Sequence, residues 1–154
     1  MHPLVDVPSV QLDPSVMARL PQWVARQRWY AGKGRLPMLS RIGGFTLDDP
    51  AGQVDITVHL LLDESGHAPT IYQVPLTTRL SPLAGGDKAL VMTLESADSR
   101  DPARYISDAP HDLAFAVALL RLMLDEQTAG SSRGHRLTAA DPGEVSASRV
   151  LVGE

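Results

Sequence analysis

Cysteine is absent from the sequence, so disulfide bonds, zinc–thiolate centres and cysteine nucleophiles are excluded. An excess of basic residues is also missing, since 14 Lys and Arg face 18 Asp and Glu, for a net charge of -4. This balance argues against a dedicated nucleic-acid binder. No apolar run approaches the roughly 20 residues of a membrane helix, and residues 1–13 lack a basic-then-apolar signal region. We expect a soluble, cytoplasmic protein with neither nucleic acid nor membrane as partner.

Helical patterns occur near both ends of a chain that is apolar enough, at 44%, to bury a core. Asp13-Pro14 is a helix-start signal. Because an interior proline removes a backbone donor, Pro21 predicts a short first turn and then a second helix over Pro21–Trp29. A Leu-rich pattern at helical spacing predicts another helix over His111–Gln127, which we expect to belong to a second, smaller unit. Asp112 is then a helix cap rather than a catalyst.

Strand patterns fill the middle of the chain. Alternation over Val54–Leu62 is the strongest of them and predicts one buried and one wet face. Pro75, in the return strand after it, requires an edge or bulge position. The other expected strands are Arg41–Asp48, Ile71–Thr78, Lys88–Glu95 and Arg149–Val152. The pattern predicts an α+β fold, in which an antiparallel sheet of four or more strands is packed by the Pro21–Trp29 helix.

Two stretches lack regular periodicity. Ser99–Pro110 is polar and contains proline, so we expect a subdomain boundary there, and Ala129–Gly134 reads as a small-residue loop. The chain stops at Glu154, directly after an expected strand, which suggests a fragment or a truncated reading frame.

No constellation of residues indicates a complete active site. Gly32-Lys33-Gly34-Arg35 lacks the spacing of a phosphate loop, so a turn with two solvated cations is expected. There is no Gly-x-Ser-x-Gly nucleophile motif. The histidines do not cluster at metal-ligand spacing, and each is expected at the surface. They are His2, His59, His67, His111 and His135.

A basic and aromatic cluster follows the first helix. It consists of Arg26, Arg28, Trp29, Tyr30, Lys33 and Arg35. Cations paired with phosphates and stacked aromatics would suit a nucleic acid or a sugar. The alternative, favoured by the low net charge, is that Trp29 and Tyr30 anchor the chain in the core. The cations would then position the turn and face solvent or a neighbouring domain.

Several segments resemble the amino-terminal cap region of actinobacterial maltokinases and the related aminosugar (glucosamine) kinases. The most specific are Leu20–Trp23 with Gln27–Arg35, and Tyr72–Leu76. Asp108–Asp112 and Val150–Glu154 resemble later parts of the same family. The family-motif residues, expected to be structural or interdomain, are Arg28, Trp29, Tyr30, Gly32, Lys33, Gly34, Arg35, Tyr72, Gln73 and Pro75. Tyr30 stands where many relatives have Phe.

The resemblance implies a bilobal kinase whose cap is a curved antiparallel sheet with a helix, similar to a cystatin fold. Residues 1–98 would form the cap, and residues 99–154 would begin a kinase-like small lobe. ATP and Mg²⁺ would bind beyond Glu154, so we expect no catalytic, cofactor or metal residues here and no activity of the chain alone. Its expected role is a non-catalytic cap that positions the small lobe in a sugar kinase of trehalose and glycogen metabolism. Its partner would be the remainder of the kinase, or a separate protein. The alternative is a stand-alone, cap-like binding module for a protein or a carbohydrate.

Overall fold

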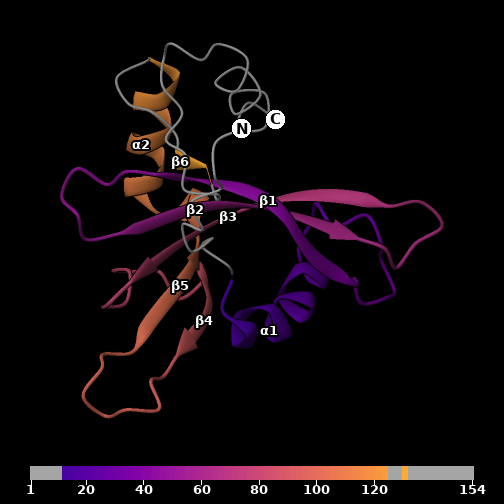
Figure 1. Cartoon of the computed structure of the whole chain (residues 1–154), viewed down its shortest axis with the longest axis horizontal. Helices are drawn as coiled ribbons and strands as arrows, with labels where there is room; N and C mark the ends of the chain where they lie inside the picture. The colour runs from indigo at the N-terminus through magenta and orange to yellow at the C-terminus, as the bar shows by residue number, and fades with distance from the viewer. Residues whose placement is uncertain (1–11, 125–129, 132–154) are drawn as a thin grey trace, which may run out of the picture.

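The computed structural model describes residues 12–124 and 130–131. They form one antiparallel sheet with the strand order β4-β5-β3-β2-β1-β6 and two α-helices (Figure 1). The α+β class and the antiparallel sheet packed by a helix, both predicted from the sequence, are confirmed. The elements are α1 (Pro14–Ala25), β1 (Leu39–Leu47), β2 (Asp55–Asp63), β3 (Thr70–Arg79), β4 (Leu90–Leu94), β5 (Arg104–Asp108), the 3-10 helix η1 (Ala109–His111), α2 (Leu113–Met123) and β6 (Gly130–Ser131).

The centre of the sheet is the long hairpin of β2 and β3. Its register runs from Asp55 opposite Thr78 to Asp63 opposite Thr70. Because side chains alternate along a strand, odd-numbered residues of β2 share a face with even-numbered residues of β3. The face that was predicted to be wet is instead buried by α1, so both faces of β2 contribute to the core.

Helix α1 packs on one face of the sheet. Asp13 caps it, since its Oδ1 accepts a hydrogen bond from the Ser15 amide at 2.8 Å. The predicted break at Pro21 is wrong: the helix passes through this residue and ends at Ala25, not at Trp29. Its buried side chains, Val16, Leu20 and Val24, continue in one stripe across the proline. Burial of that stripe offsets the roughly 3 kcal/mol that an interior proline costs.

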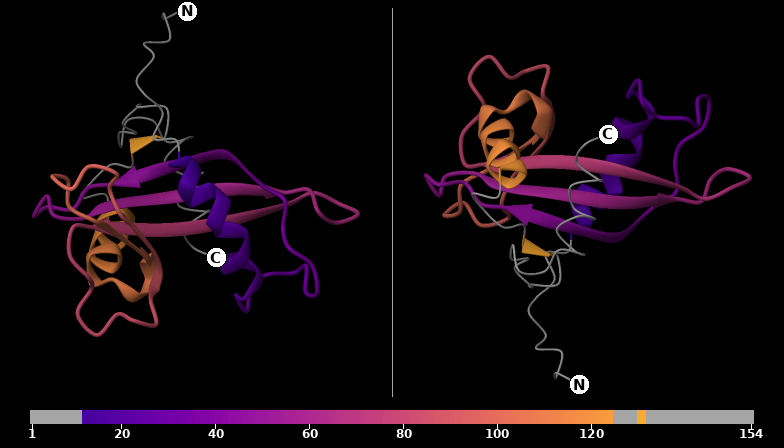
Figure 2. Two further views of the ribbon diagram at one scale, coloured as in Figure 1. Left: turned by 90° about the horizontal axis from the view of Figure 1, so that it is seen from below. Right: turned by 90° about the horizontal axis from the view of Figure 1, so that it is seen from above.

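Helix α2 packs on the opposite face. It buries Phe115, Ala118 and Leu122 against side chains of β1 and β2, including Phe45 and Ile56. Seen from below, α1 crosses the strands, and seen from above, α2 lies over one end of them (Figure 2). The buried face of α2 thus packs on the same sheet as α1, and the expectation that this helix belongs to a second, smaller unit stays a prediction.

Strand β5 was not predicted. Its residues lie within the polar stretch Ser99–Pro110, yet they pair with both β3 and β4. Only Tyr105 and Ile106 are large and apolar in β5, too few for a period-2 pattern to stand out. The sheet thus continues beyond residue 98. The division of the chain at that residue into a cap and the start of a small lobe stays a prediction.

Candidate functional site

The segment between α1 and β1 carries the first family motif, and Tyr30 anchors it. Tyr30 is 2% exposed, and its hydroxyl donates to the Arg35 carbonyl at 2.9 Å. Its ring lies 5.8 Å from that of Tyr72, whose hydroxyl accepts from the Ala31 amide at 3.1 Å. The predicted anchoring role of Tyr30 is confirmed, and Tyr72 joins the two sequence motifs in space.

Trp29 does not share this burial. It is 43% exposed, so the prediction that it packs into the core is wrong. The physical reason is that α1 ends at Ala25, which places Trp29 in a turn at the surface. Its ring lies 6.0 Å from Trp23 in an edge arrangement and 5.4 Å from Tyr72. Three aromatic rings therefore form a partly exposed cluster beside the sheet.

The two glycines of the motif, Gly32 and Gly34, are required for different reasons. Gly34 has φ +89°, a conformation that side chains rarely adopt, as expected for a reversing turn. Gly32 is needed for space, because a Cβ there would lie 2.6 Å from Cζ of Tyr30. The turn thus reverses at Gly34 and lies tightly over the buried tyrosine ring at Gly32.

The cationic side chains of the motif differ in their hydrogen-bond partners. Lys33 donates from Nζ to the Gln27 carbonyl, and Arg35 donates from Nε to Ser65 Oγ at 3.2 Å. Both therefore hold the turn, as predicted, while remaining exposed. Arg28 is exposed and its side chain forms no hydrogen bond or ion pair within the described residues, so its predicted role in positioning the turn is not seen.

Gln73 and Pro75 lie on the other face of the sheet from Tyr72. They are opposite Leu60 and Val58, so the structure does not bring them to the aromatic cluster. Pro75 directly precedes the residues of β3 that pair with β5, which begin at Leu76. At Pro75, β2 is therefore the one partner of β3 among the described strands. The expected edge position of the proline is met locally.

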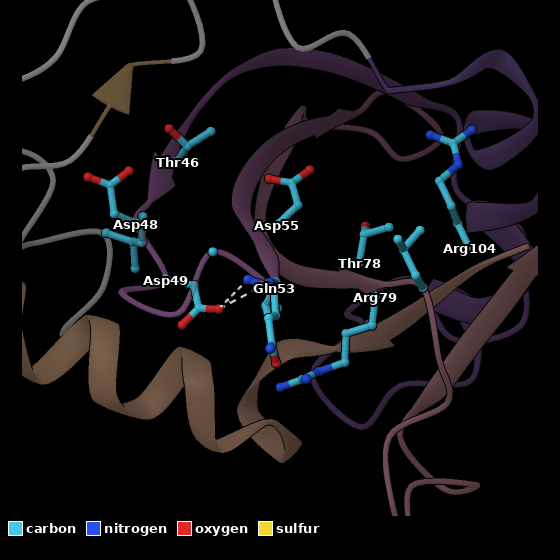
Figure 3. Close-up of a pocket in the computed structure, with 12 residues that line it drawn as sticks. Thr46, Asp48, Asp49, Gln53, Asp55, Thr78, Arg79 and Arg104 are labelled. Carbon is cyan, nitrogen blue, oxygen red and sulfur yellow. Dashed lines mark hydrogen bonds between the residues drawn. The ribbon is translucent and has the colours of Figure 1, made fainter. Parts of the chain in front are cut away.

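At the opposite end of the sheet lies an open groove of about 560 Å³ with a mixed-charge lining (Figure 3). Asp49 uses one carboxylate oxygen to accept from the amides of Gln53 and Val54, which closes the β1–β2 turn. Arg104 lies 3.5 Å from Asp13. Sequence reasoning missed this groove because its residues come from separate strands and loops. Asp49 and Arg104 are thus engaged in contacts that hold the fold.

Arg79, which lines this groove, forms a bidentate ion pair. Its Nε and Nη2 donate to the two carboxylate oxygens of Asp112 at 2.8 and 2.9 Å. Asp112 Oδ1 also accepts from the Ala114 amide at 2.9 Å, which confirms its predicted role as helix cap. Burial alone would raise the pKa of Asp112, but the hydrogen bonds from Arg79 and Ala114 outweigh it and lower the pKa.

His59 contradicts its predicted surface position, since it is 4% exposed. Its Nδ1 accepts from Arg41 Nε at 3.0 Å. Burial, aided by the positive charge of Arg41, lowers the pKa of His59 to about 3, so the ring is neutral at physiological pH. The prediction failed because α1 covers the strand face that alternation marked as wet.

Among the remaining carboxylates, Asp63 serves the fold. Asp63 is buried and accepts from the amides of Met38 and Ser65, both at 2.9 Å. His67 and His111 are exposed, as predicted. The expectations for His2, His135 and Arg149–Val152 lie outside the described residues. The expected Ala129–Gly134 loop is wrong in its described part, because Gly130 and Ser131 form β6 and pair with β1. Over residues 12–124 and 130–131, no group of three or more His, Asp or Glu side chains could hold a metal ion. Neither described helix has the length and apolar character needed to cross a membrane.

The sequence was compared with models of known protein families, and one family model matches. The family model for the maltokinase N-terminal cap domain matches residues 23–112, from the aromatic cluster through the Asp112 cap. No curated protein and no solved structure gives a significant match to the chain.

Proposed function

The chain belongs to the maltokinase N-terminal cap domain family, and we propose that it is a non-catalytic cap that docks on the small lobe of an ATP-dependent sugar kinase and positions it. The family assignment supports the kinase context. The docking surface that we assign is the outer face of α2, and this face is the observation that carries the proposal.

Helix α2 is apolar on both sides. Its inner side chains are buried on the sheet, as described above. Its outer side exposes Leu113, Val117 and Leu120, by 76%, 42% and 55%, and Leu124 follows directly after the helix at 59%. These positions are spaced by three or four residues, so they form one continuous stripe. A helix that is apolar all round is normally buried, and this stripe therefore calls for a partner surface.

The proposed reaction is transfer of the terminal phosphate of ATP to a sugar hydroxyl, in which positioning and charge neutralisation dominate. We assign ATP and Mg²⁺ to the kinase lobes, not to this cap. The Gly32–Gly34 turn lies over Tyr30, and Lys33 is engaged with the Gln27 carbonyl, which supports placing the phosphate site outside this segment. A rigid cap that holds the small lobe would limit how far the lobes open. In this proposal the cap works in the cytoplasm, with the remainder of the kinase as its partner.

The test combines the 154-residue chain with a maltokinase from which the cap has been removed. Binding is measured by sedimentation velocity, and kinase activity by maltose-dependent ADP formation. We expect the chain alone to form no ADP, and to bind the truncated kinase and raise its activity. Leu120→Lys should weaken that binding at least about tenfold, since it places a charge in the apolar stripe.

Leu80→Lys is the matched control, because Leu80 is equally large and is 64% exposed outside α2. It should bind as the unaltered chain does. ADP formation by the chain alone, or equal binding by the two variants, would overturn the proposal.

A further inference from the structure

Cations are concentrated at one end of this chain. From Pro14 to Met38 the sequence contains five cationic residues and none of the 18 Asp and Glu. The remainder of the chain is correspondingly acidic, since the net charge is -4. In the fold, this segment runs along α1 and then past the end of the sheet where β2 meets β3 (Figure 1). The segment is therefore locally basic in an otherwise acidic chain, with Asp63 and Glu64 as the acidic residues next to its end.

Two of these five cationic side chains have no hydrogen-bond or ion-pair partner within the described residues. Arg19 donates to the Thr93 carbonyl, and Lys33 and Arg35 hold the turn. Arg26 and Arg28 are exposed, and neither side chain forms a hydrogen bond or ion pair within residues 12–124 and 130–131. Two guanidinium groups thus stand close together in the sequence and are free to meet carboxylates, which they can bind bidentately.

An aromatic residue follows them directly in the sequence. Trp29 follows Arg28 and is 43% exposed, yet it is held by ring contacts to Trp23 and Tyr72. Tyr30, the next residue, is fixed by its hydrogen bond to Arg35. An exposed indole with restricted motion loses little entropy on binding. Trp and Arg are also the residues that most often dominate interface energies.

We propose that the basic-aromatic surface, made of Arg26, Arg28, Trp29 and Lys33, is a docking site for an acidic segment of a partner protein. The carboxylates of the segment would pair with Arg26 and Arg28, and an apolar side chain of the segment would pack on Trp29. A polyanion such as DNA is disfavoured because the remainder of the chain, negatively charged, would repel it. Charge complementarity thus selects a short acidic segment that engages only this end.

The basic-aromatic surface is independent of the docking face on α2. Helix α2 packs beside Phe45, Val54 and Ile56, at the end of the sheet where β2 begins. The aromatic cluster lies beside Tyr72, near the end where β2 stops. The two surfaces also lie on opposite faces. This inference does not rest on the proposed kinase cap, and one molecule could bind both partners at once.

The test measures the fluorescence anisotropy of a short fluorescein-labelled peptide in which Glu residues flank a central Leu, titrated with the 154-residue chain. We expect saturable binding that weakens as NaCl is raised from about 50 to about 500 mM. Arg26→Glu with Arg28→Glu should weaken binding at least about tenfold, and Trp29→Ala by a similar factor. A peptide with Lys in place of Glu should not bind.

Lys88→Glu with Arg100→Glu is the matched control, since both side chains are exposed and lie outside the basic-aromatic surface. It makes the same change in net charge and should leave binding unchanged. Leu120→Lys should also leave it unchanged, which separates this site from the face on α2. Thermal melts establish that each variant is folded. The proposal is overturned if the acidic peptide does not bind, if both double variants weaken it equally, or if single-stranded DNA or phosphatidylserine vesicles bind more tightly than the peptide.

Discussion

Arg79 and Asp112 connect the end of β3 to the start of α2 through a bidentate ion pair in which the Asp112 side chain is fully buried. The same carboxylate caps α2. One contact thus sets where the second helix begins and how it is held to the sheet. The apolar stripe proposed for docking is positioned by this pair.

We therefore expect Arg79→Met to destabilise the fold by about 3–5 kcal/mol, because it leaves a buried carboxylate without its counter-charge. The double variant with Asp112→Leu should lose less than Arg79→Met alone. Arg104→Met is the control, since the Arg104–Asp13 pair is about half exposed and such pairs contribute about 0–1 kcal/mol. Urea unfolding measures all three. Equal losses for Arg79→Met and Arg104→Met would contradict the assignment of a buried pair.

Tyr30 and Trp29 are adjacent aromatic residues with opposite burial, so their truncations should differ. Tyr30→Ala should cost about 3–5 kcal/mol, as large aromatic deletions in cores do. Trp29→Ala should cost only about 1–2 kcal/mol, because much of its ring already contacts water. Tyr30→Phe isolates the hydroxyl bond to Arg35, which contributes about 1 kcal/mol. Chemical denaturation with near-ultraviolet circular dichroism measures these differences. A larger loss at Trp29 would show that the cluster, not Tyr30, anchors the segment.

The neutral, buried His59 should make stability depend on pH. Its pKa is about 3 in the fold and about 6.5 when unfolded, so between these values the unfolded chain binds the extra proton. The contribution of His59 to the free energy of unfolding is therefore fully present above about pH 6.5. It falls as the pH decreases toward 3, by at most roughly 1.4 kcal/mol per pH unit.

Urea unfolding at several pH values between about pH 7 and pH 5 tests this. Over that window the carboxylates of Asp63 and Asp112, whose pKa values are lowered in the fold, stay ionised in both states. His59→Gln, which keeps an acceptor for Arg41, should flatten the dependence. His67→Gln should not, because His67 is exposed. An unchanged slope in His59→Gln would mean that other groups carry the pH dependence.

Local patterns predicted several elements well. Alternation located β2, the Asp13-Pro14 pair located the start of α1, and Asp112 was correctly interpreted as a cap. These signals depend on hydrogen bonds and burial within a few residues, which the sequence shows directly. The end of α1 was misplaced because the effect of Pro21 depends on how well the buried stripe packs, and no local rule measures that.

By itself, the sequence determined the α+β class, the long β2–β3 hairpin, the turn at Gly34 and the family to which the chain belongs. The tertiary structure decided which sides of these elements are covered. It buried His59 under α1, left Trp29 at the surface, inserted β5 between β3 and β4, and brought Arg79 to Asp112. Each of these outcomes depends on residues distant in sequence coming into contact. The free energy of such contacts comes from burial and pairing that exist only once the sheet and both helices have packed together.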